Sequence, residues 1–176
     1  MLKKSLLCSL FFANILFASG SEVNVYSQRH YDSDKALFKK FEEKTGIKVN
    51  LITAKAEELV SRLSIEGANS PSDILITADI GNLYEAKERD LLQGVSSKVL
   101  EKNIPAHLRD EGGKWFAITK RARLFVYNPK TINPAHLDDY FSLTKPEFKG
   151  KVITRSSTNA YNKSLLASII AHHGEE

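Results

Sequence analysis

The stretch VNVYSQRHYDSDKALFKKFEEKTGIKVNLIT, residues 23–53, carries the signals of a strand, a helix and a second strand in that order. VNVYS at residues 23–27 alternates apolar and polar side chains and then breaks, which is typical of a strand. An apolar helical face follows at Leu37, Phe38 and Phe41. Three residues could cap the first turn of this helix: Asp32, Ser33 and Asp34. Gly46 stands where the helix should end, and KVNLIT at residues 48–53 predicts the second strand.

The alternation of strand and helix continues beyond this stretch. AEELVSRLSIEG at residues 56–67 has apolar side chains at helical spacing, and DILITAD at residues 73–79 is a nearly continuous apolar run. Such a run favours a strand covered on both faces, and residues 81–94 predict a helix closed by Gly94. This order predicts an α/β fold with a parallel sheet, in which ligands gather beyond the carboxyl ends of the strands. The tyrosine, histidine and arginine of YSQRHY lie at such an end.

The second half of the chain changes character. Residues 95–114 form a loose polar segment, and residues 115–129, WFAITKRARLFVYNP, predict a strand long enough to cross between two lobes. Residues 130–176 predict a short helix, a strand at residues 151–154 and a helix capped near Ser157 or Thr158. We expect residues 21–114 to form a first α/β lobe, and residues 130–176 to begin a second lobe that is truncated. Too little apolar surface remains there to close a second core.

The first twenty residues differ from the rest. Lys3 and Lys4 precede an apolar run that ends in small side chains, which is the order of a signal peptide at residues 1–20. A retained membrane anchor is the alternative, although the run is shorter than the roughly 20 residues that a span needs. Cys8, the single cysteine, interrupts the run instead of following it, which argues against lipidation. We therefore expect export and no membrane insertion after cleavage.

The charge balance argues against nucleic acid as a partner. The formal charge of +4 includes Lys3 and Lys4, so removal of the signal leaves +4 − 2 = +2. No stripe of basic residues with interleaved aromatic residues remains to follow a phosphate backbone. The chain also contains no GxSxG, no HExxH and, once the signal is removed, no cysteine nucleophile. The absence of these motifs therefore argues against an enzyme.

Several motifs together resemble one family. The stretches YSQRHY, FEEKTGIKV, PSDILITAD, GKWFAITKRARLFVYNP and LTKPEFKGKV are similar to the periplasmic ferric-ion-binding proteins of ABC iron-uptake transporters. LTKPEFKGKV marks only the wider class of two-lobed receptors, whereas YSQRHY with KRARLFVYNP narrows the resemblance to the ferric branch. The resemblance implies a two-lobed periplasmic-binding-protein fold that closes on one ligand, with residues 115–129 as a crossing strand or hinge. It also implies delivery of iron to an inner-membrane ABC permease, and a monomer when the protein is full length.

The resemblance also implies which residues hold the metal. His30 and Tyr31 match first-lobe ligands of the branch that uses histidine and tyrosine, and Tyr161 matches a second-lobe tyrosine. A pair of consecutive tyrosines that the family carries further on does not occur here, so we expect it beyond Glu176. Carbonate or another small anion often accompanies the iron, and Arg121 or Arg123 would contact it.

The chemistry of these residues agrees with a hard metal ion. Fe³⁺ prefers anionic oxygen, which a tyrosine phenolate supplies, and its charge favours loss of the phenol proton. Each residue also has an ordinary interpretation: a surface histidine at His30, half-buried tyrosines at Tyr31 and Tyr161, and ion-paired arginines at Arg121 and Arg123. Tyr26, within the first strand, is interpreted as packing. The alternative function is a related receptor for an organic or inorganic anion, without iron.

Overall fold

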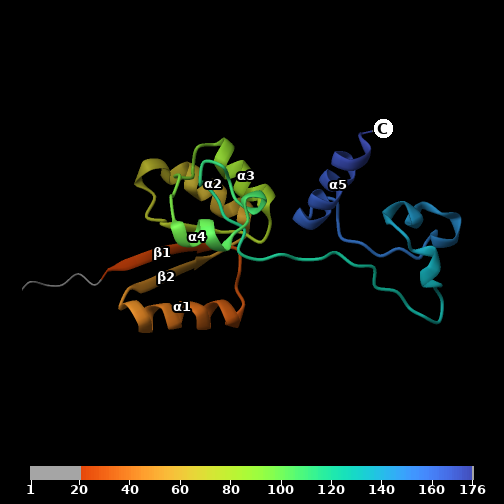
Figure 1. Ribbon diagram of the computed structural model, residues 1–176, viewed down its shortest axis with the longest axis horizontal. Helices are drawn as coiled ribbons and strands as arrows, with labels where there is room; N and C mark the ends of the chain where they lie inside the picture. Colours follow the sequence, from red (N-terminus) through yellow and green to blue (C-terminus); the bar gives the residue numbers. More distant parts are fainter. Residues whose placement is uncertain (1–20, 176) are drawn as a thin grey trace, which may run out of the picture.

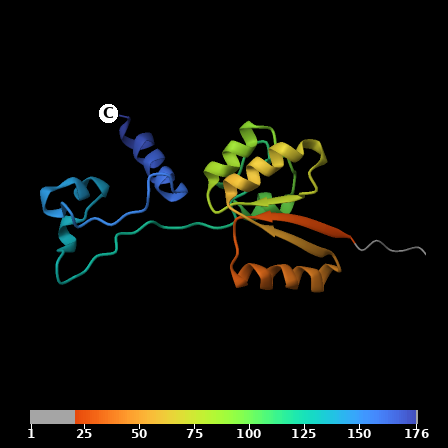
Figure 2. The ribbon, with the colours of Figure 1, turned by 180° about the vertical axis from the view of Figure 1, so that it is seen from behind.

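The computed structural model describes residues 21–175, and it divides into an α/β part and a set of helices beyond it. Both views show an extended segment leading from the α/β part to the later helices (Figure 1 and Figure 2). The predicted signal peptide and Cys8 lie outside the described residues. Within residues 21–175, no helix combines the length and apolarity needed to cross a membrane.

A parallel three-stranded sheet forms the centre of the α/β part. Its strands are β1 (Glu22–Ser27), β2 (Lys48–Thr53) and β3 (Ile74–Ile76). Their order is β2-β1-β3, and Val25 of β1 pairs with Leu51 on one side and Ile74 on the other. The predicted α/β class with a parallel sheet is therefore confirmed. Because all strands run the same way, their carboxyl ends meet at one edge.

Helices cover both faces of this sheet. Figure 1 shows α1 on one face, and α2, α3 and α4 on the other. The α-helices are α1 (Asp32–Thr45), α2 (Ala56–Glu66), α3 (Ile80–Glu88), α4 (Lys98–Asn103) and α5 (Ala160–His173). Short 3₁₀ turns are η1 (Gly67–Asn69), η2 (Ala106–Leu108), η3 (Pro134–His136), η4 (Tyr140–Thr144) and η5 (Pro146–Phe148). The central strand β1 is consequently enclosed, and Val25, Tyr26 and Ser27 are buried.

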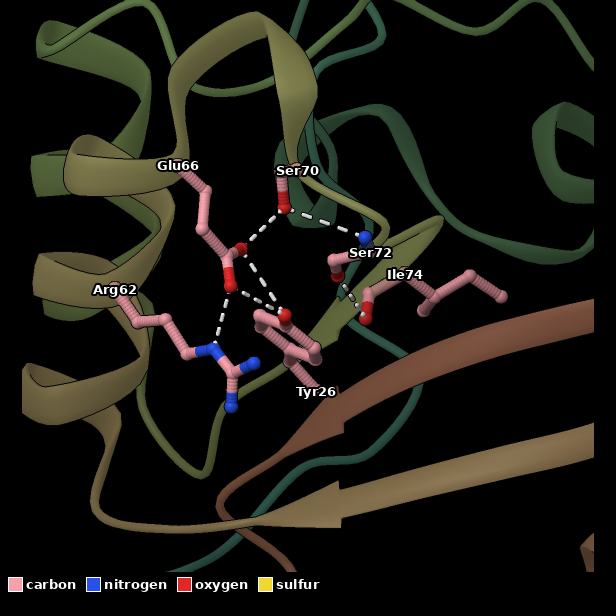
Figure 3. A network of polar contacts seen from close by, with 6 residues as sticks. All are labelled: Tyr26, Arg62, Glu66, Ser70, Ser72 and Ile74. Atoms are coloured by element: carbon pink, nitrogen blue, oxygen red, sulfur yellow. Dashed lines mark hydrogen bonds and ion pairs between the residues drawn. The ribbon is translucent and has the colours of Figure 1, made fainter.

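Tyr26 anchors the core between β1 and α2. It is fully buried and packs with Leu59 and Leu63 of α2, which confirms its interpretation as a packing residue. Its hydroxyl lies 2.9 and 3.0 Å from the two carboxylate oxygens of Glu66, as Figure 3 shows. Burial, followed by the Glu66 hydrogen bond, raises the pKa of the Tyr26 phenol. The buried hydroxyl is thus satisfied, and this tyrosine is unavailable to a ligand.

Helix α1 ends where the sequence predicts, but its N-cap is a different residue. Gly46 ends the helix in the left-handed conformation at φ 70°, as predicted. The N-cap is Tyr31, which makes no side-chain capping bond, and not one of the three expected residues. Asp34, one of those three, is instead engaged by Arg29 through a pair of hydrogen bonds.

Two predictions were wrong: the length and burial of β3, and the end of the helix that follows it. The strand is only three residues long, and Ile74 is 45% exposed, so it is not covered on both faces. In the described chain β3 pairs with β1 alone and forms an edge of the sheet. The following helix ends at Glu88, and not near Gly94, because Asp90 adopts φ 54° and Leu91 turns back onto the Tyr26 cluster.

The expected strands of the second half are not formed. Within the described chain, residues 115–129 make one isolated bridge, between Arg109 and Phe116, and Val126 is 97% exposed. Residues 151–154 are likewise not a strand. A strand needs a neighbour along its whole length for its backbone hydrogen bonds, and apart from this bridge residues 21–175 place no strand beside either segment.

Two local predictions in the second half also changed. The segment predicted as loose and polar contains α4, which Ser97 caps through its hydroxyl. Helix α5 is capped by Asn159, and not by Ser157 or Thr158, because the Asn159 side chain accepts from the backbone N–H of Tyr161. This cap places Tyr161 in the first turn of α5.

Candidate functional site

His30 and Tyr31 lie at the carboxyl end of β1, where the chain turns into α1. Their rings are stacked, with centroids 5.2 Å apart and planes inclined by 22°. Neighbouring residues of a regular strand point to opposite faces, so the stacking requires the bend that the chain makes here. His30 is exposed and Tyr31 is 54% exposed, which leaves both side chains accessible.

A short hydrogen-bonded turn produces this bend. The buried Ser27 hydroxyl donates to the Arg29 carbonyl and accepts from the Arg29 N–H. The Arg29 guanidinium then reaches forward to Asp34, with Nε–Oδ2 and Nη2–Oδ1 distances of 3.0 and 2.9 Å. These bonds hold the pKa of Asp34 below its ordinary value. The same guanidinium lies 5.2 Å from the centroid of the Tyr31 ring.

Tyr161 is surrounded by arginines. The guanidinium carbons of Arg121 and Arg155 lie 4.3 and 5.3 Å from its ring centroid. Arg123 donates to the backbone carbonyl of Tyr161. Arg121 and Arg123 form no salt bridge within the described residues, so the ion-pair interpretation of these two is not what the structure shows. Both instead contact the tyrosine that the sequence singled out.

Arg121 links this arginine cluster to the carboxyl edge of the sheet. It donates to the backbone carbonyl of Ala78, just after β3. The N–H of Ala78 in turn donates to the side chain of Gln28 at 2.8 Å, and Gln28 directly follows β1. Arg121, Arg123, Arg155 and Tyr161 line a cleft of about 2470 Å³ that also includes residues of the α/β part such as Ala78.

The two predicted parts of the site are near each other but not in contact. Two phenols, those of Tyr31 and Tyr161, contribute to the raised pKa of Arg29, after the larger contribution of its hydrogen bond to Asp34. The connection between the two parts that the structure shows is Arg121, which contacts the Tyr161 ring and donates to the Ala78 carbonyl at the edge of the sheet. No ring contact joins Tyr31 to Tyr161 within residues 21–175, and the residues lining the cleft do not include His30 or Tyr31.

The donor chemistry restricts what kind of metal could bind here. Across residues 21–175 no cluster of three or more His, Cys, Asp or Glu side chains has the geometry of a metal site. At the carboxyl edge of the sheet, Tyr31 presents a phenol and His30 an imidazole. Phenolate and imidazole donors without thiolate suit a hard ion such as Fe³⁺.

Arg29 and Arg155 also belong to this region, although neither was among the predicted site residues. Arg29 stood inside the quoted YSQRHY motif, and an acidic residue five positions later was the available signal for its ion pair. Arg155 had no comparable signal, because its position beside Tyr161 depends on the turn that precedes α5.

Comparison with known proteins reveals similarity along most of the chain. The profile of the family described as bacterial extracellular solute-binding protein matches residues 26–162. Iron uptake protein A1 of Synechocystis is 50% identical over 155 residues, which cover 88% of this chain and 43% of that protein. The chain thus spans less than half the length of this curated relative.

Solved structures agree with the sequence comparison. The structure of the ferric binding protein from Campylobacter jejuni is 60% identical and superposes with a TM-score of 0.83, covering 87% of this chain and 49% of that one. A Trichodesmium protein in complex with iron and citrate is 47% identical, with a TM-score of 0.81 and coverages of 88% and 49%. These matches support the predicted two-lobed periplasmic-binding fold, of which the parallel-sheet lobe is described here.

Proposed function

We propose, from the premise that this chain belongs to the bacterial extracellular solute-binding protein family, that its protein captures ferric ion and presents it to an inner-membrane ABC permease. Relatives named as iron uptake and ferric binding proteins support the choice of cargo. A solute-binding role also accounts for an exported protein without enzymatic motifs. Capture would take place in the periplasm, and the full-length protein would act as a monomer.

The observation that carries the proposal is the arrangement of phenols at the carboxyl edge of the sheet. His30 and Tyr31 present stacked, accessible rings there, and Arg121 connects the Tyr161 ring to the same edge through the carbonyl of Ala78. A ferric ion bound by Tyr31 and Tyr161 would receive two anionic oxygens, and His30 would add a nitrogen.

The arginines beside Tyr161 suit a small anion that would bind together with the metal. Arg121 and Arg155 flank the ring, and Arg123 contacts the adjacent backbone. Guanidinium groups bind carboxylate or carbonate through paired hydrogen bonds, so an anion placed here would occupy a coordination position beside the protein donors. Carbonate is our first choice for this anion.

The division of the chain follows from the same proposal. Residues 21–114 would be the first lobe, residues 115–129 the crossing segment and residues 130–176 the start of the second lobe. The extended backbone between the two helical groups in Figure 1 supports this division. Because Tyr31 and Tyr161 belong to different lobes, capture of one ion would draw the lobes together.

A second candidate is an anion receptor that does not use iron. The three arginines around Tyr161 favour it, since they would bind an oxyanion whether or not a metal were present. The two functions differ in a visible property, because iron bound to a phenolate absorbs visible light by charge transfer and an anion alone does not.

Titration of the purified protein with ferric citrate tests the proposal. We expect a coloured complex at one iron per protein, and weaker binding with reduced colour in Tyr31→Phe and Tyr161→Phe. Each substitution removes only the phenol oxygen and should leave the fold intact. Tyr84→Phe is the matched control, because Tyr84 lies on α3 and is 57% exposed.

Two results would contradict the proposal. A parent protein that stays colourless with ferric citrate and binds carbonate or citrate alone would favour the anion receptor. Equal affinity and absorption in the parent, Tyr31→Phe and Tyr161→Phe would remove these tyrosines from the site.

A further inference from the structure

The turn that carries His30 and Tyr31 is built by residues that are not themselves candidate ligands. Ser27 is 1% exposed, and its hydroxyl bonds to both backbone groups of Arg29. The Arg29 side chain crosses the turn and forms two parallel hydrogen bonds to Asp34 in the first turn of α1. The loop is thereby fixed at its start by a buried hydroxyl and at its end by a charged pair.

These hydrogen bonds explain how the rings of His30 and Tyr31, which are adjacent in sequence, can lie on the same side of the turn. Tyr31 is the N-cap of α1, and its carbonyl accepts from the N–H groups of Asp34 and Lys35. The helix start alone therefore sets the backbone of Tyr31 but not the direction of its ring. The Arg29 guanidinium lies 5.2 Å from the ring centroid of Tyr31, and the His30 ring lies 5.2 Å from it as well. Tyr31 is thus contacted by both of the preceding side chains.

We propose that Arg29, held by its two-point pair with Asp34, is a positioning residue that keeps the His30 and Tyr31 rings together on one side of the turn. The inference rests on the proposed function, because positioning matters only if these rings bind iron. Arg29 does not bind the metal, because its guanidinium is a cation with no acceptor atom, and two of its N–H groups donate to Asp34. Its effect on iron is indirect, through the placement of the two ligands.

The planar fork of arginine is the part of the residue that the proposal depends on. Two parallel bonds to one carboxylate fix both the distance and the plane of the guanidinium, which a lysine ammonium cannot do. A role through positive charge alone would be retained by lysine. The comparison of Arg29→Lys with Arg29→Gln therefore separates positioning from simple electrostatic attraction.

A matched arginine elsewhere in the chain serves as control. Arg62 also pairs with a carboxylate, Glu66, and its guanidinium lies 4.9 Å from the centroid of Tyr26. Figure 3 shows this pair in the core network between β1 and α2. Because Tyr26 is buried and engaged by Glu66, Arg62→Gln should change stability without changing iron binding.

The experiment measures iron affinity by citrate competition, together with the visible charge-transfer band, in the purified protein. We expect Arg29→Gln and Arg29→Lys each to weaken iron binding about 10- to 100-fold, as loss of groups that orient metal ligands does. Both should shift the absorption band, since the Tyr31 oxygen would approach the iron differently. Asp34→Asn tests the same fork from its other end and should weaken binding in the same direction.

Three results would overturn the inference. These are unchanged affinity and absorption in Arg29→Gln, full recovery in Arg29→Lys, and an equal loss of affinity in Arg62→Gln. The first removes Arg29 from the site, the second reduces its role to charge, and the third reduces it to general stability.

Failure of the proposed function would be distinguishable from failure of this inference. If the parent protein binds no iron, NMR of the iron-free protein still reports where the His30 and Tyr31 rings lie, through the resonances of these rings. Arg29→Gln should then shift both ring resonances by NMR, and Arg62→Gln should leave them in place. Unshifted rings in Arg29→Gln would overturn the positioning role independently of iron.

Discussion

Replacement of Tyr26 by phenylalanine isolates the contribution of one buried hydroxyl to stability. The hydroxyl lies 2.9 and 3.0 Å from the two oxygens of Glu66, while the ring packs against Leu59 and Leu63. Phenylalanine keeps the ring contacts and removes only the hydrogen bond. A hydrogen bond to a charged group contributes about 1.5–3 kcal/mol net. Glu66 would keep Arg62 and Ser70 as partners, so we expect the lower half of this range.

The expected loss corresponds to a measurable change in melting temperature. For a chain of this size, a loss of about 2 kcal/mol lowers Tm by roughly 4–8 °C. Thermal and urea unfolding at pH 7, followed by circular dichroism in the iron-free protein, would measure it. Tyr84→Phe, at an exposed position on α3, should stay within about 0.5 kcal/mol of the parent. If Tyr26→Phe also stayed within that margin, the network in Figure 3 would not stabilise the fold as argued.

The same variant predicts a pH dependence with a definite sign. Hydrogen bonds from Ser70 and Arg62, and then from Tyr26, lower the pKa of Glu66 in the folded protein. A carboxyl with a lowered folded pKa adds stability above its unfolded pKa, near 4.3, and loses that stability as pH falls through the folded value. The difference between the parent and Tyr26→Phe should therefore be largest above about pH 4.3 and shrink below it. A difference that grew as the pH was lowered would contradict this assignment.

Two further predictions concern the arginines and a glycine turn. Arg121→Ala combined with Arg123→Ala should make iron binding less dependent on added carbonate, because both side chains contact Tyr161. If a titration of the double variant shows the same carbonate dependence as the parent, both arginines have a structural role only. Gly113→Ala should cost about 2 kcal/mol or more in urea unfolding, because Gly113 has φ 70° and a Cβ there would lie 2.5 Å from a backbone oxygen. Gly150→Ala, at φ 73° with open space around it, should cost less, and equal losses would show that the close approach has no effect.

The first third of the fold could be predicted because its signals are local. Alternation predicted β1, a left-handed glycine ended α1 at Gly46, and KVNLIT became β2 with the expected bounds. The strands expected at residues 115–129 and 151–154 were wrong because a strand also needs a partner, which pattern alone does not reveal. The first residue of a helix was harder to predict for a related reason. Asp34 has a partner of its own, Arg29, and does not cap α1.

The place of the candidate residues in the fold could be predicted, but their contacts could not. The end of β1 located His30 and Tyr31, because parallel strands gather ligand-binding residues at their carboxyl ends. Their stacking depends on a turn that the sequence did not show, and the approach of Arg155 to Tyr161 depends on the path of the chain before α5. Such contacts arise from tertiary structure, so residue spacing could not supply them.

Burial, and not residue type, separates the two arginine–tyrosine pairs of this chain. Arg62 with Tyr26 and Arg29 with Tyr31 have nearly equal spacing, at 4.9 and 5.2 Å, and each arginine also pairs with a carboxylate. Tyr26 is fully buried with its hydroxyl held by Glu66, so its oxygen is committed to the core. Tyr31 is 54% exposed at the edge where ligands of parallel sheets collect, so its oxygen stays accessible. The same local chemistry therefore stabilises the fold in one place and, by our proposal, orients a metal ligand in the other, which is why Arg62→Gln and Arg29→Gln should affect different measurements.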